Sequence, residues 1–220
     1  MRSTPISSRP AAPLSRVGRT VGALVIALTA SVGLCIGPVA TAGAATAVAK
    51  AVQGGGLSVT PPPAWTSLSI DDPKLADALT AAGKVNPQFR NLTPKSMKDA
   101  GIAFFAVDSK SKNPDYVNNV NGQVVVPGPP SLAGSEPELK AALVGQGATV
   151  TSQTRITAAG TEAVRSLYKI NVNALSGKKL TVYGTQVVLV KAGKLYIVTI
   201  SLDTADPAIA NAIIASIKVK

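Results

Sequence analysis

The chain has 220 residues, of which 46% are hydrophobic and only 4% aromatic, and its 22 basic and 11 acidic residues give a formal net charge of +11. It contains no histidine and a single cysteine, so Ser-His-Asp triads, Cys-His pairs and ordinary zinc sites cannot be assembled. No Walker loop, dinucleotide-binding glycine fingerprint or calcium loop is present. We therefore expect no catalytic residue, no cofactor and no metal.

Residues 1–44 have the pattern of a secretory signal peptide. Four arginines without an acidic residue precede an apolar run over residues 21–36, which Gly37 and Pro38 end. That run is shorter than the roughly 20 residues that a spanning helix needs. Small residues then predict cleavage after Ala42 or Ala44. The cleavage region comprises Ala42, Gly43, Ala44 and Ala45. We expect a secreted protein with no stable membrane span after processing.

Cys35 lies inside the apolar run and allows two interpretations. A bacterial lipoprotein signal has a small residue directly before its cysteine, but Leu34 occupies that position here. The pattern therefore favours a small apolar residue that leaves with the signal peptide over a lipid anchor. The mature chain would then contain no cysteine, and its core alone would stabilise it outside the cytoplasm.

Without the four signal-peptide arginines, 18 basic residues remain against 11 acidic ones. The densest clusters are Lys110 with Lys112, Lys178 with Lys179, Lys191 with Lys194, and Lys218 with Lys220. Such lysines either keep turns and sheet edges solvated or attract an anionic envelope surface, lipid head groups or an acidic protein. Nucleic acid is not expected as a partner, because no aromatic residues interleave with the charges.

The first predicted elements are short. Residues 45–56 are small and featureless, and we expect a flexible leader before a single domain over residues 57–220. A strand over residues 57–60 ends at a run of three prolines. Trp65 follows, either as a core anchor or as a surface on which a ligand stacks. The pairs Asp72-Pro73 and Thr93-Pro94 predict helix starts.

The central region is predicted to contain two strands and a helix. Residues 102–109, with Phe104 and Phe105, form a continuous apolar run that is typical of a buried strand. We expect a polar, Asn-rich loop over residues 109–121 and a second strand over residues 122–126. Ser135 then begins a predicted capping box for the next helix.

The C-terminal half predicts an antiparallel meander of four strands, because short glycine-containing links join runs rich in Val, Ile, Thr and Tyr. In the last strand, Tyr196, Val198, Ile200 and Leu202 make the apolar face, while Leu195, Ile197, Thr199 and Ser201 point the other way. Asp206-Pro207 opens a closing helix whose isoleucines would pack on the apolar face. The fold class is α+β, a curved antiparallel sheet of about six strands flanked by helices.

The order of these elements resembles a known family. The segments "PPPAW", "AFFAVD", "VNGQVVV", "TEAVRSLYKI", "TQVVLVKAGKLYIVTISL" and "DPAIANAIIASIKV" are similar to those of actinobacterial LpqN/LpqT-type envelope proteins. The resemblance implies a PsbP-like α/β/α sandwich, related to the Ran-binding MOG protein and exported to the cell envelope without catalytic activity. Many members carry a proper lipid-attachment sequence, and this chain does not.

Three functions remain open from the sequence. The first is a non-enzymatic binding protein that is secreted or envelope-associated and contacts an envelope protein or an anionic lipid surface. The second is a carrier or sensor of an apolar or lipidic ligand held between sheet and helix, with Trp65, Phe104 and Phe105 as the candidate ligand-binding residues. The third is a carboxylate hydrolase, for which Asp71 with Asp72 and Glu136 with Glu138 are the nearest pairs, although helix capping explains both pairs better.

Overall fold

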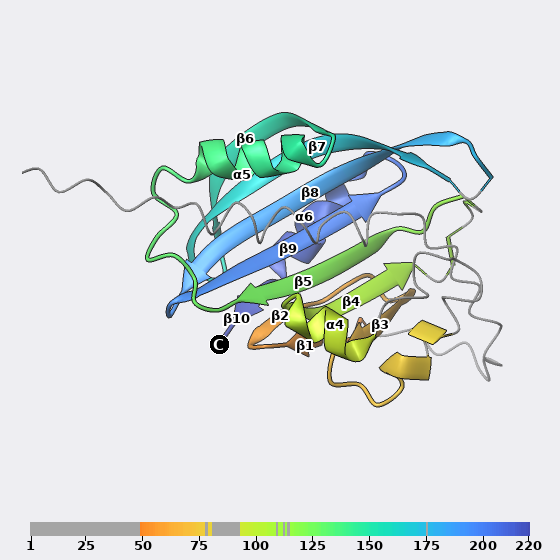
Figure 1. Cartoon of the computed structure of the whole chain (residues 1–220), viewed down its shortest axis with the longest axis horizontal. Helices are drawn as coiled ribbons and strands as arrows, with labels where there is room; N and C mark the ends of the chain where they lie inside the picture. The colour runs from red at the N-terminus through yellow and green to blue at the C-terminus, as the bar shows by residue number, and fades with distance from the viewer. Residues whose placement is uncertain are drawn as a thin grey trace, which may run out of the picture.

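The structure is a computed structural model that describes residues 49–77, 79–80, 93–108, 110–111, 113, 115–174 and 176–220. A seven-stranded antiparallel sheet dominates it (Figure 1), with the strand order β3-β4-β5-β9-β8-β7-β6. Its strands are β3 (Trp65–Ser69), β4 (Ile102–Asp108), β5 (Asn119–Val125), β6 (Ala148–Ala158), β7 (Thr161–Asn173), β8 (Lys179–Lys191) and β9 (Lys194–Leu202). The predicted α+β class is confirmed.

The predicted four-strand meander is confirmed as β6, β7, β8 and β9, each paired antiparallel with the next. Ala159 and Gly160 link β6 to β7, with φ angles of 52° and 72°. Ala192 and Gly193 link β8 to β9, with φ angles of 50° and 70°. Two consecutive residues of positive φ are what a tight hairpin turn needs to follow the natural twist of its strands. These turns fix the register of the C-terminal half.

A second, three-stranded sheet includes residues 52–54, which the sequence placed in a flexible leader over residues 45–56, while residues 45–48 lie outside the described residues. β1 (Val52–Gly54) pairs with β2 (Leu57–Val59), and β2 pairs with β10 (Lys218–Val219) at the C-terminus. A Cβ atom on Gly54 would lie 2.1 Å from the backbone oxygen of Ala103. β1 is thus seated directly on β4, and only glycine permits that approach.

Three further differences from the sequence-based expectations concern local structure. β3 was not predicted at all, although Trp65 begins it. β5 starts at Asn119, inside the predicted loop over residues 109–121. Ser135 precedes α5 (Glu136–Gly145), but its hydroxyl donates to the Leu132 carbonyl at 2.7 Å and caps no helical amide. By contrast, Thr93 forms a capping box with Ser96 at the start of α4 (Pro94–Asp99).

The closing helix α6 (Pro207–Ala215) packs on the face of the sheet that the sequence predicted. The Asp206 carboxylate accepts hydrogen bonds from the amides of Ala208 and Ile209, both at 3.0 Å, and so caps the helix. Ile213 and Ile217 join the largest apolar cluster. The β9 residues of that cluster are Tyr196, Val198, Ile200 and Leu202.

The opposite face carries α5 and α4, which lie in front of the sheet in Figure 1 while α6 lies behind it. Leu139 of α5 packs with Val188 on β8 and Ile197 on β9. Met97 of α4 packs with Phe105 near the other edge. The two helices therefore cover the two sides of this face and leave its middle to other residues.

An ionic contact ties α5 to the neighbouring strands. The Arg155 guanidinium on β6 contacts both Glu136 of α5 and Glu162 of β7. The pKa of the Glu136 carboxyl is lowered, first by its own backbone amide at the helix start and then by Arg155. Among the residues that the structure describes, no helix is long and apolar enough to cross a membrane.

Candidate functional site

Polar side chains fill the middle of the sheet face between α5 and α4. Together they form what we call the polar belt. Its members are Asn119, Asn121 and Gln123 on β5, Thr199 and Ser201 on β9, Gln186 on β8, and Ser166 on β7. Each of these residues is at most 2% exposed. The belt is therefore a buried polar layer inside an otherwise apolar sheet.

Strand register places these side chains in rows. Asn121 pairs with Thr199, and Thr199 also pairs with Gln186 on its other side. Gln186 pairs with Ser166, which in turn pairs with Gln153 on β6. Directly paired residues of an antiparallel sheet lie on the same face. At about 4.8 Å per strand, this row crosses five strands over about 19 Å.

Most of the polar atoms in the belt have no hydrogen-bond partner among the described residues. Seven such atoms are buried: Asn119 Oδ1, Asn121 Oδ1 and Nδ2, Gln123 Nε2, Gln186 Oε1 and Nε2, and Thr199 Oγ1. The Ser201 hydroxyl is not counted, because it interacts with the phenols of Tyr116 and Tyr168. Leaving one buried polar group unpaired costs about 1–3 kcal/mol. Summed over seven atoms, that cost is comparable with the net stability of a whole domain, about 5–15 kcal/mol. Ordered water or a bound molecule with donors and acceptors would satisfy these atoms.

Two tyrosines border the belt. Tyr116 is fully buried and accepts a hydrogen bond from Asn119 Nδ2 at 3.3 Å. The ring of Tyr168 lies against Gly184, where a Cβ atom would be 2.0 Å from the ring. Burial raises the pKa of both phenols well above the usual value, and the nearby Ser201 hydroxyl only partly opposes this. Both phenols therefore stay protonated across the physiological pH range.

The chemistry available to the belt is hydrogen bonding alone. Its side chains are amides and aliphatic hydroxyls, which neither gain nor lose a proton near neutral pH. The bordering phenols stay neutral for the reason given above. No carboxylate, lysine or arginine belongs to it, so it has neither a general base nor a net charge. The arrangement suits a ligand that is itself uncharged and rich in hydroxyl or amide groups.

The three aromatic residues predicted to bind a ligand lie in two different clusters. Trp65 and Phe104 belong to the core beneath α6. Phe105, on the next position of β4, points to the opposite face and packs with Met97. The structure therefore does not bring the three together, and none of them lines either of the two surface hollows described below. Their role in binding stays a prediction.

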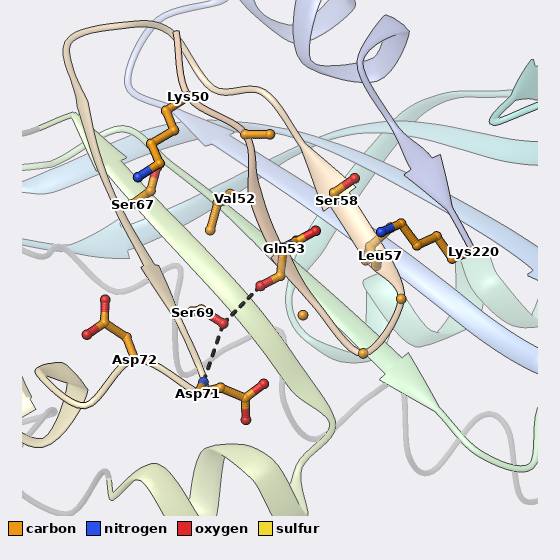
Figure 2. Close-up of a pocket in the computed structure, with 14 residues that line it drawn as sticks. Lys50, Val52, Gln53, Leu57, Ser58, Ser67, Ser69, Asp71, Asp72 and Lys220 are labelled. Carbon is orange, nitrogen blue, oxygen red and sulfur yellow. Dashed lines mark hydrogen bonds between the residues drawn. The ribbon is translucent and has the colours of Figure 1, made fainter.

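One surface hollow, of about 530 Å³, lies beside the small sheet (Figure 2). Lys50 and Lys220 lie on its rim, as do Asp71 and Asp72. The Ser69 hydroxyl donates to the Gln53 carbonyl at 2.9 Å and so links the two walls. The hollow is of mixed charge.

The carboxylate pairs considered from the sequence show no hydrolase geometry. Asp71 and Asp72 are neighbours on one rim of this hollow, and its other charged residues are lysines. Glu136 is held by Arg155, and Glu138 lies in the first turn of α5. Within the described part of the chain, no group of three or more acidic, cysteine or histidine residues could hold a metal ion.

Several predictions lie outside the described residues. These concern the signal peptide, Cys35 and the cleavage region at Ala42, Gly43, Ala44 and Ala45. The described residues did contain a signal for the belt that sequence analysis missed. Asn119, Asn121 and Gln123 alternate with apolar or small residues, as do Thr199 and Ser201. An alternating polar set on two adjacent strands indicates a polar stripe on one face.

Comparisons with known proteins give structural neighbours only. No protein-family model and no curated protein matches the chain. The cyanobacterial PsbP protein of Synechocystis sp. PCC 6803 is 14% identical, with a TM-score of 0.46, over 84% of this chain and 100% of that one. LpqN, involved in cell envelope biogenesis of Mycobacterium tuberculosis, is 14% identical, with a TM-score of 0.42, over 78% of this chain and 91% of that one. A variant of the protein Mog1 is 11% identical, with a TM-score of 0.45, over 78% of this chain and 96% of that one.

Proposed function

We propose that this chain is a non-enzymatic binding protein, exported to the cell envelope, that holds an uncharged, hydroxyl- or amide-rich ligand against the polar belt. The observation that carries the proposal is the set of seven buried polar atoms without partners among the described residues. Because the belt residues are at most 2% exposed, a ligand reaches them only when the residues that cover the belt move aside. A ligand of this chemistry supplies donors and acceptors for amides and hydroxyls at once. A neutral saccharide is the simplest compound of this class.

Two observations favour binding over catalysis. The belt has no group that takes up or releases a proton near neutral pH, because its members are amides and hydroxyls. The chain contains no histidine, and the carboxylates of the described residues lie outside the belt. A site of this kind can orient and retain a ligand, but it offers no nucleophile activated by a base.

An apolar ligand inside the core beneath α6 is disfavoured by the packing there. The Phe104 ring occupies the space above Gly122, where a Cβ atom would be 2.3 Å from the ring. Leu57 and Ile213 are fully buried in the same cluster. A core in which an added methyl group has no room offers no internal space for a lipid chain.

The lysines at one end of the sheet support contact with an anionic envelope surface. Lys191 and Lys194 flank the β8-β9 turn, and Lys218 and Lys220 lie at the nearby C-terminus, to the lower left in Figure 1. None of the four forms an ion pair with a described residue. Val126, 66% exposed, directly follows the adjacent strand β5. We call this set the lysine end.

The belt is tested by calorimetric titration with a neutral disaccharide, N,N'-diacetylchitobiose, which carries both hydroxyl and amide groups. We expect saturable binding that Gln186→Leu weakens roughly tenfold or more, because two hydrogen-bonding atoms are lost and each hydrogen bond contributes about 0.5–1.5 kcal/mol. The matched control is Thr154→Val, an exposed position on the other face of β6. Equal affinity in Gln186→Leu and the parent protein would contradict the proposal.

The lysine end is tested by sedimentation with phosphatidylglycerol vesicles. Replacing Lys191, Lys194, Lys218 and Lys220 with glutamine is expected to abolish binding, since each lysine near such a surface contributes about 1 kcal/mol. Glutamine at Lys95, Lys98, Lys110 and Lys140 changes the net charge equally and is expected to preserve most of the binding. Equal loss in both variants would show that only net charge matters and would overturn the assignment of this surface.

A further inference from the structure

A second site lies on the opposite face of the sheet, between the strands and the first turn of α6. It is a groove of about 560 Å³, within the size range of small-molecule sites. β7 and β8 form its floor, and residues 205–211 form its wall. The belt side chains lie on the α5 side of the sheet and none of them lines the groove, although Tyr168, which borders the belt, does.

The floor of the groove carries two cationic residues, four positions apart on β7. Arg165 and Lys169 both line it. Arg165 Nε is buried and has no hydrogen-bond partner among the described residues. Lys169 Nζ lies 5.4 Å from the centre of the Tyr183 ring, which holds the ammonium group over the floor. The groove thus contains a guanidinium whose buried Nε has no partner among the described residues, and an ammonium group positioned over the Tyr183 ring.

The remaining surface of the groove is largely apolar. Leu167 and Leu202 contribute from the strands, and Pro207 and Ala210 contribute from the helix. Asp206 also lies here, but its carboxylate accepts the helix amides and is committed to the cap. The first amides of α6 are therefore paired with Asp206. The charged groups that can attract a ligand are Arg165 and Lys169.

We propose that this groove binds an anionic amphiphile, a compound with one carboxylate or phosphate head and a short apolar tail. The head pairs with the Arg165 guanidinium, the Lys169 ammonium group four residues along β7 adds positive potential, and the tail lies against Leu202 and Ala210. A charged donor that is partly removed from water gains most from an ionised acceptor. The uncharged ligand proposed for the belt does not match this site, so the groove adds a second binding activity.

The test is calorimetric titration of the whole protein with sodium decanoate below its critical micelle concentration, with decyl phosphate as the second head group. Decanol, which has a similar tail without the charge, is expected to bind much more weakly than either. Arg165→Gln is expected to weaken binding roughly 10- to 100-fold, which corresponds to the loss of a charged hydrogen bond. Arg165→Lys keeps the charge but lacks the guanidinium, and its affinity is expected to lie between those of the parent protein and Arg165→Gln.

Two further variants locate the ligand. Asn211 is exposed on α6 and lines the groove, so Asn211→Trp is expected to block the mouth and abolish binding without disturbing the core. Lys95→Gln, on α4 at the opposite face, is the charge control and is expected to bind like the parent protein. Unchanged affinity in Arg165→Gln and Asn211→Trp, equal affinity for decanol and decanoate, or no saturable binding would each overturn the proposal.

Discussion

Phe104→Ala is expected to lower the free energy of unfolding by about 3–5 kcal/mol, the usual cost of deleting a fully buried aromatic ring. Phe104 is 0% exposed and contacts Gly122 on the adjacent strand. Gly122→Ala is expected to lower the free energy of unfolding by about 1–3 kcal/mol. Here the core is overfilled, because the added methyl group would overlap the Phe104 ring. Urea unfolding followed by circular dichroism measures both values.

The double variant of Phe104→Ala and Gly122→Ala distinguishes packing from a ligand role. Its loss of stability is expected to be smaller than the sum of the two by about 1 kcal/mol or more, because the methyl group enters the space that the ring leaves. Phe105→Ala is the matched control, since Phe105 points to the other face and its effect should add to that of Gly122→Ala. If Phe104→Ala left stability unchanged but removed ligand binding, Phe104 would be a binding residue after all.

Thr199→Val is expected to raise the free energy of unfolding of the ligand-free protein by about 1–2 kcal/mol. The Thr199 hydroxyl is fully buried and has no partner among the described residues. Replacing it with a methyl group of the same shape removes a desolvation cost of about 1–3 kcal/mol. Thermal unfolding at matched pH and salt measures the change.

The exposed position Thr154 on β6 provides the control for this prediction. Thr154→Val makes the same chemical change where water satisfies the hydroxyl, so it is expected to change stability by less than about 0.5 kcal/mol. A polar residue that is retained although it destabilises the free protein is typical of a binding site. A loss of stability in Thr199→Val would instead show that the hydroxyl is already paired in the free protein.

The C-terminal half of the fold was predictable because its signals are local. Turns with two residues of positive φ, alternating strands and the Asp206 cap each specify structure within a few residues. β1 and β10 could not be predicted in this way. They have three and two residues, and β10 forms only because it pairs with β2 from the other end of the described chain. Such pairing depends on the completed core.

The belt escaped prediction for a different physical reason. Asparagine is depleted in strands, so the segment around Asn119 and Asn121 indicated a loop. In the folded chain, flanking strands β4 and β9 complete the backbone pairing of β5 and override that preference. Among the aromatic candidates, the two-residue period of a strand places Phe104 and Phe105 on opposite faces of the sheet, so the two cannot line one site. The low strand preference of asparagine thus explains why β5 was predicted to begin too late. The alternation of side chains along β4 explains why the aromatic candidates do not form one site.

The most direct test of the belt as a ligand-binding surface is nuclear magnetic resonance of the side-chain amide groups of Asn121, Gln123 and Gln186 during titration with N,N'-diacetylchitobiose. These groups are buried, so their signals report on the belt itself. We expect all three to shift together and to saturate with one dissociation constant, while the side-chain amide of exposed Asn211 stays in place. Saturable binding without a change in the signals of the belt amides, or with changes confined to exposed side-chain amides, would contradict the account.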